Sequence, residues 1–286
     1  MRQPLLAGAA TALALVVATV VFALLHDDPP PPPPELPPTA PKAGAPPYDA
    51  EAFQPFDYES GTSIGFLERG SRGMAHVIYA LSPGGVSRSV ARTRRWEPAI
   101  ERATAGTDVT PSELEAMVFL ESAGRPAVMA DGTPNSATGL MQILPSTAVS
   151  LLGMRVDLAR SLEIDRELGR ARHRAAVSRK PRKRRAARRL VRALLRERLV
   201  ADERFDPDKA LAGAVRYLSI AERRFGRRDL AIASYHMGIG NLTTLIRTYV
   251  SPRRPARTTR RTVRRDGLTW PQLYYDSSPT RNPRTW

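Results

Sequence analysis

An unbroken proline run near the N-terminus constrains the fold of this chain more than any other feature. It spans Pro29 to Pro34, and further prolines follow up to Pro47. Proline fixes φ near −65° and removes the backbone donor, so this segment is expected to be an extended polyproline II linker. At about 3.1 Å per residue, residues 29–47 reach about 60 Å. The linker acts either as a spacer that holds a domain away from a membrane or as a plain solvated connection.

The segment before the prolines has the length of a membrane span. Residues 5–25 carry no charge, and at 1.5 Å per residue their helix would be about 30 Å long, which matches a bilayer core. Arg2 precedes the run and Asp27 follows it, so the rest of the chain is predicted to lie outside a bacterial cell membrane. We therefore assign residues 1–28 to a cytoplasmic stub and a single-pass transmembrane anchor. The alternative is a signal peptide, which would release a secreted protein, although the run is long for one and is followed by a poor cleavage site.

The composition excludes several kinds of chemistry. The chain has no cysteine, which excludes disulfides, thiolate metal sites and a cysteine nucleophile. Its four histidines are scattered, which argues against a histidine-rich metal site. We expect no metal and no organic cofactor. An apolar content of 42% is sufficient for a packed core.

A helix that begins near Thr110 carries the first candidate catalytic residue. Thr110, Pro111 and Glu113 form a capping box with proline at the first helical position. Glu121 ends an apolar stripe with i, i+3, i+4 and i+7 spacing. Burial on such a face raises the pKa of a carboxyl group, and a carboxylic acid that stays protonated near neutral pH is suited to general acid catalysis. The alternative is a glutamate that reaches solvent past the end of the stripe.

Several short motifs follow Glu121–Ser122 in a fixed order. They are Gly139-Leu140-Met141-Gln142, Pro145, Thr147-Ala148, Asp206-Pro207, Gly213, Tyr217-Leu218 and the segment from Tyr235 to Gly240. This order resembles the soluble lytic transglycosylase (SLT) catalytic domain of the lysozyme-like superfamily. The resemblance covers about residues 94–249 and implies a mainly α, lysozyme-like helical domain. The predicted organisation is an extension at 48–93, a catalytic domain at 94–250 with a basic insert at 155–201, and a basic and aromatic tail at 251–286.

The resemblance implies a lyase that acts on peptidoglycan in the cell wall. In the family, the glutamate of the Glu-Ser pair is the only essential carboxylate. Carried over, Glu121 protonates the β-1,4 bond between MurNAc and GlcNAc and then removes the proton of the MurNAc C6 hydroxyl, which closes on C1. The product is a 1,6-anhydro-MurNAc end, whereas ordinary glycoside hydrolysis typically uses two carboxylates and water.

The resemblance also implies roles for other residues. Tyr235 matches a tyrosine that hydrogen-bonds the catalytic glutamate and orients it, so Glu121 and Tyr235 are the predicted catalytic residues. The predicted substrate-binding residues are Ser122, Gly139, Met141, Gln142, His236, Gly238 and Asn241. His236 replaces the usual asparagine and brings a group that titrates near pH 6.5. Core packing is the alternative for Met141, and a helix cap and turn is the alternative for Asn241.

Two basic stretches account for most of the net charge of +16. Residues 170–198 hold 14 Lys and Arg with one acidic residue, and residues 253–265 hold seven arginines. Leu190, Val191, Leu194 and Leu195 indicate a helix in the second half of the first stretch. Anionic wall polymers or lipid headgroups are the expected partners, and a solvated insert without a partner is the alternative. Nucleic acid is disfavoured because the uncharged run at residues 5–25 predicts export.

Two further functions stay open at this point. The same fold supports a hydrolytic muramidase, and the change at His236 is compatible with a catalytically weakened scaffold that binds the cell wall.

Overall fold

The computed structural model describes residue 78 and residues 81–250 and 259–276. The predicted membrane segment at 5–25 and the proline linker at 29–47 lie outside these residues, as does most of the extension at 48–93. Within the described residues, no helix has the length and apolar character that a membrane span needs.

The described residues are mainly helical, which agrees with the predicted fold class, and their β-pairing is confined to three isolated bridges. The helices are α3 (Val86–Arg94), α4 (Glu97–Thr104), α5 (Pro111–Ser122), α6 (Pro145–Ser150), α7 (Leu158–Val177), α8 (Pro181–Ala201), the 3-10 helix η1 (Glu203–Phe205), α9 (Pro207–Phe225), α10 (Arg228–Met237), α11 (Ile239–Val250), α12 (Thr259–Asp266) and α13 (Trp270–Asp276).

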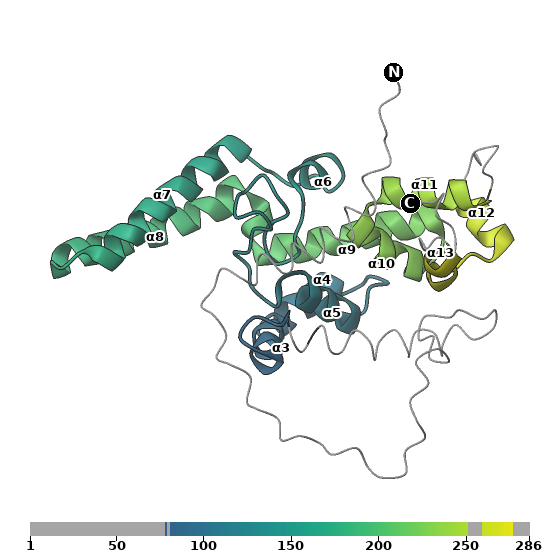
Figure 1. Ribbon diagram of the computed structural model, residues 1–286, viewed down its shortest axis with the longest axis horizontal. Helices are drawn as coiled ribbons and strands as arrows, with labels where there is room; N and C mark the ends of the chain where they lie inside the picture. The colour runs from purple at the N-terminus through teal and green to yellow at the C-terminus, as the bar shows by residue number, and fades with distance from the viewer. Residues whose placement is uncertain (1–77, 79–80, 251–258, 277–286) are drawn as a thin grey trace, which may run out of the picture.

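Helix α9 forms the centre of the main core. Asp206 caps its first turn by accepting from the backbone of Asp208 and Lys209, and it ends at Gly226 in the left-handed conformation. Helices α4, α10 and α12 pack against it, and its buried face includes Leu211 and Phe225. Figure 1 shows α9 crossing the body of the molecule.

Helix α5 begins where the sequence predicts. Thr110 Oγ1 accepts from the Glu113 backbone, and the Glu113 carboxylate accepts from the Thr110 backbone at 2.8 Å. The helix ends at Ala123, whose φ of 50° turns the chain sharply. The catalytic candidate Glu121 is therefore in the last turn of a well-capped helix that packs against α4 and α9.

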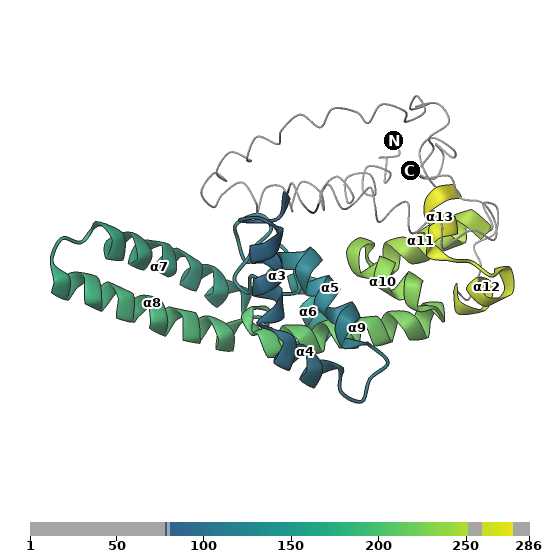
Figure 2. The same ribbon diagram turned by 90° about the horizontal axis from the view of Figure 1, so that it is seen from below.

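The predicted basic insert is a helical hairpin made of α7 and α8. The two helices pack along each other around a small separate core of Ile164, Leu168, Ala171 and Leu194. Figures 1 and 2 show that this hairpin extends away from the rest of the described structure. Its two ends meet, because Val156 and Asp202 form a bridge and Asp157 N donates to Ala201 O at 2.8 Å. The second-half helix that the sequence predicts is α8, and α7 was not predicted.

Candidate active site

Glu121 has the electrostatic character of a general acid. Its side chain is 14% exposed and follows the buried residues Leu114, Met117 and Val118 on the same face of α5. Burial raises the pKa of the Glu121 carboxyl from 4.5 to about 8. The carboxyl is therefore protonated at neutral pH. The rise of its pKa is the shift that the apolar stripe predicts.

His236 is the neighbour of this carboxyl. It comes from the last turn of α10, and its Nδ1 lies 3.2 Å from Glu121 Oε1. Burial lowers the pKa of the His236 imidazole, so both groups are neutral near pH 7. The pair is then a contact between a carboxylic acid and a neutral imidazole, close enough for a hydrogen bond that orients the carboxyl.

Tyr235 has a different partner from the one that the resemblance implies. We expected its hydroxyl to bond Glu121, but it donates to Met141 O at 2.8 Å. A hydroxyl has one proton, and here the carbonyl receives it. The ring also packs edge-on against Tyr217, with centroids 4.9 Å apart. Burial and the nearby Glu121 charge raise the pKa of Tyr235 well above 10, so it stays neutral. Tyr235 thus joins α10 to the Gly139–Gln142 loop beside the acid.

Three predicted substrate residues have internal roles in the structure. Ser122 is 3% exposed and its Oγ donates to Val118 O at 3.2 Å, within its own helix. Met141 is fully buried in the main core, which corresponds to the core-packing alternative. Gly139, at φ 80°, is required because a Cβ there would lie 1.9 Å from Arg204 O. The space beside Gly139, where the resemblance implies a substrate contact, is taken by the protein's own backbone.

Gln142 occupies a strained position in the same loop. Its φ is 46°, a conformation that L-residues other than Asn and Asp rarely adopt. Its side-chain Nε2 donates to Gly139 O at 2.9 Å and to Val128 O at 3.2 Å. Observed outliers of this kind cluster at functional sites. The half-exposed Gln142 therefore remains a candidate for substrate contact. Its side-chain nitrogen also holds the loop together through the two carbonyls that it bonds.

The α10–α11 junction leaves other predicted residues accessible. Gly238 separates the two helices with φ 87°, and a Cβ there would meet only Asn241 Nδ2, at 3.9 Å. Asn241 is exposed and its Nδ2 donates to Met237 O at 2.7 Å. Because His236 precedes this junction and contacts Glu121, the junction borders the acid.

A buried ion pair that no sequence pattern predicted supports the same loop. Asp202 and Arg204 are both 0% exposed, and Arg204 Nη2 lies 2.7 Å from Asp202 Oδ2. Arg204 also donates to the carbonyls of Pro134, Ser136 and Ile143. Asp202 in turn accepts from Ser161 Oγ of α7 at 2.9 Å. Both residues lie beside a long basic stretch, where nothing in the sequence pattern signals burial.

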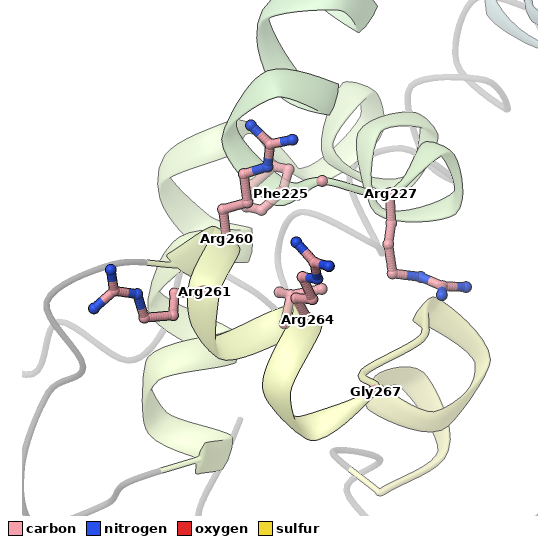
Figure 3. Close-up of a pocket in the computed structure, with 8 residues that line it drawn as sticks. Phe225, Arg227, Arg260, Arg261, Arg264 and Gly267 are labelled. Carbon is pink, nitrogen blue, oxygen red and sulfur yellow. The ribbon is translucent and has the colours of Figure 1, made fainter.

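A pocket away from Glu121 is rimmed by arginines. Arg227, Arg260, Arg261 and Arg264 line it together with Phe225, Gly226, Val263 and Gly267. Figure 3 shows the Arg264 guanidinium between those of Arg260 and Arg227, whereas Arg261 points away. Arg227 is paired with Asp229 at 2.9 Å. The described residues contain no cluster of three or more His, Cys, Asp or Glu that could hold a metal ion.

Comparisons with known proteins match part of this chain to one family. Residues 98–165 and 184–253 match the family model of the transglycosylase SLT domain. Two curated proteins from Klebsiella pneumoniae strains, both named endo-type membrane-bound lytic murein transglycosylase A, are 37% identical to this chain over 70 residues. The match covers 24% of this chain and 33% of each relative, so the chain spans about a third of the length of these relatives. No solved structure matches. Residues 166–183, which the family match omits, form the outer part of the α7–α8 hairpin.

Proposed function

Because residues 98–165 and 184–253 belong to the transglycosylase SLT domain family, we propose that this protein is a peptidoglycan lytic transglycosylase. It cleaves the β-1,4 bond between MurNAc and GlcNAc without water and leaves 1,6-anhydro-MurNAc ends. The observation that carries the proposal is the Glu121 carboxyl, which is buried at the end of α5 and protonated near neutral pH.

Glu121 acts first as an acid and then as a base. It donates its proton to the glycosidic oxygen as the C1–O bond breaks. The MurNAc C6 oxygen then attacks C1, and its proton passes to the Glu121 carboxylate. Glu121 ends the cycle protonated, so one carboxyl group suffices where a hydrolase typically uses two.

The surroundings of Glu121 favour both steps. A raised pKa keeps the proton on the carboxyl at neutral pH and makes the carboxylate formed in the first step a stronger base. The neutral imidazole of His236 adds no charge that would lower this pKa. Tyr235 acts as a positioning residue, because its hydrogen bond to Met141 O holds α10 against the loop that carries Gln142.

We assign substrate contact to the residues that border Glu121. His236, Gly238, Asn241 and Gln142 contact the glycan strand in this proposal, and the side chains of Ser122 and Met141 support the fold behind it.

The membrane is a further part of the proposal. We propose that residues 5–25 anchor the protein in the cell membrane and that the catalytic domain lies outside. The support is the uncharged run, followed by acidic residues, together with the word "membrane-bound" in the names of the two relatives.

Mass spectrometry of muropeptides released from purified sacculi tests the reaction. The full chain should release anhydro-MurNAc products, and Glu121→Gln should lower the rate by about 10³-fold, near the middle of the range for a general acid and base. Glu115→Gln, on the same helix and with no ion pair among the described residues, is the matched control and should stay active.

The other outcomes replace the proposal by a named alternative. Reducing ends in place of anhydro ends would identify a hydrolytic muramidase. Binding to sacculi without release of any product would identify a scaffold that binds the cell wall.

A further inference from the structure

The outer part of the α7–α8 hairpin carries a concentration of unpaired positive charge. We call residues 168–196 the distal arm; it holds 13 Lys and Arg and no Asp or Glu. All 13 side chains are exposed, and within the described residues none of them has an ion-pair partner. A face of this kind attracts a polyanion.

The base of the same hairpin is different. Arg160 pairs there with Glu163, Glu167 and Glu197 at 2.6–3.4 Å. Arg198 pairs with Asp165 at 2.6 Å and is 3% exposed. Positive charge is thus balanced near the body and unbalanced away from it, so the distal arm is distinguished by the absence of acidic partners and not by its arginine content alone.

The arginines of α8 form an ordered row. Arg185, Arg189, Arg192 and Arg196 follow i, i+4, i+7 and i+11 spacing, so they lie along one side of the helix over about 16 Å. Buried Ala187 and Leu194 are on the side that packs against α7. Like charges at i, i+4 repel each other, and a bound anion removes this repulsion.

The shape of the distal arm argues against a lipid surface as partner. An interfacial helix places an apolar face in the headgroup region, often with aromatic residues. Here the buried apolar residues of α7 and α8 pack against each other, the exposed large apolar side chains of the distal arm are Val177 and Leu190, and residues 158–201 contain no Phe, Trp or Tyr. The lack of aromatic residues also removes the stacking platforms that single-stranded nucleic acid uses.

Part of the distal arm, up to residue 183, lies outside the family match. The family match omits residues 166–183, and Figures 1 and 2 show the hairpin directed away from the body that contains α5 and α10. The four arginines of the row fall within the matched residues 184–253, and the helix α8 that carries them is directed away from α5.

We propose that the distal arm binds a linear phosphodiester polymer without bases that accompanies the glycan strands, and so holds the catalytic domain on cell wall that carries such a polymer. Guanidinium groups match phosphate oxygens in a bidentate geometry, and a row of them suits repeated phosphates along a strand. The location of this partner rests on the proposed function, whereas its chemistry rests on the arm.

Binding of the full chain to insoluble cell wall tests the proposal. Wall that retains its phosphodiester polymers is compared with the same wall after hydrofluoric acid has cleaved them, both treated with nuclease. We expect wild type to bind the intact wall at least about tenfold more tightly, with an affinity that falls steeply with salt.

Two charge-matched variants locate the effect. The arm variant carries Arg185→Gln, Arg189→Gln, Arg192→Gln and Arg196→Gln. The control carries Arg223→Gln, Arg260→Gln, Arg261→Gln and Arg264→Gln, which are also exposed and without an ion pair among the described residues. The arm variant should lose the preference for intact wall, and its salt slope should fall by about 3, from about 0.7 per phosphate contact on a flexible strand. The control should keep both, and circular dichroism should show unchanged helix content in each.

Several results would overturn the proposal. They are equal binding of wild type to intact and stripped wall, an equal loss in the control variant, loss of the preference when nuclease is used, and binding to vesicles with anionic phosphatidylglycerol that is as tight as binding to wall at equal phosphate. Failure of the proposed function gives a different result, because wild type would then release no anhydro ends from stripped wall. The Glu121→Gln variant should bind intact wall as wild type does.

Discussion

Asp202 and Glu121 are two acidic residues whose side chains are largely buried, and their surroundings differ. Asp202 accepts hydrogen bonds from the Arg204 backbone and guanidinium and from Ser161 Oγ. Glu121 has only the neutral His236 at 3.2 Å and, within the described residues, no lysine or arginine partner. A carboxylate that is fully hydrogen-bonded holds the structure together, whereas a buried carboxyl without a cationic partner keeps its proton and can transfer it.

The stability of two variants tests the difference between Asp202 and Glu121 with the largest expected effect. Arg204→Met leaves the Asp202 charge buried without its partner, so the free energy of unfolding should fall by about 3–5 kcal/mol. Glu121→Gln replaces a neutral acid by a neutral amide and should change it by less than about 1 kcal/mol at low pH. Urea denaturation measures both. Equal losses in the two variants would mean that Glu121 is as structural as Asp202.

The pH dependence of stability tests the raised pKa of Glu121. Between pH 4.5 and about 8 the folded protein keeps the Glu121 proton that the unfolded chain has lost. The stabilising contribution of Glu121 to the free energy of unfolding is fully present below pH 4.5 and is lost as the pH rises through about 8. Relative to Glu121→Gln, wild type should therefore lose about 1.4 kcal/mol per pH unit within this window. Urea denaturation of both proteins at several pH values tests this, and parallel curves would contradict the raised pKa.

The smallest predicted effect belongs to His236. Burial lowers its pKa, so it becomes charged only below pH 6.5, and an imidazolium beside Glu121 weakens the carboxylate as a base. We expect the rate of anhydro-product release to fall on the acid side of the pH profile in wild type, and the fall to be reduced in His236→Asn. At neutral pH the two rates should agree within about tenfold. If His236→Asn shows the same fall in rate at low pH as wild type, His236 does not affect the reaction.

The parts of the fold that were predictable depend on local signals. The start of α5 is set by Thr110, Pro111 and Glu113, whose contacts are all within one turn, and the apolar spacing along the helix gives the burial of Glu121. The boundary between α3 and α4 at Arg95 and Trp96 has no such capping signal.

The parts that were not predictable depend on long-range contacts. Arg204 meets carbonyls more than 60 residues away in the sequence, and no pattern distinguishes it from the exposed arginines before it. The partner of Tyr235 is likewise set by where the Met141 carbonyl lies after folding. Helix α7 was missed because its strongly charged sequence masks a buried face of Ile164, Leu168 and Ala171.

The meeting of the two ends of the hairpin has an evolutionary consequence. Asp157 and Ala201 are joined by a backbone hydrogen bond, so the chain leaves the body and returns to it at one point. The length and charge of the distal arm can change without moving the residues on either side, as in tolerated domain insertions, whereas Ser161 at the base is held to Asp202. The distal arm can thus be replaced or altered in charge while the helical body around Glu121 keeps its fold.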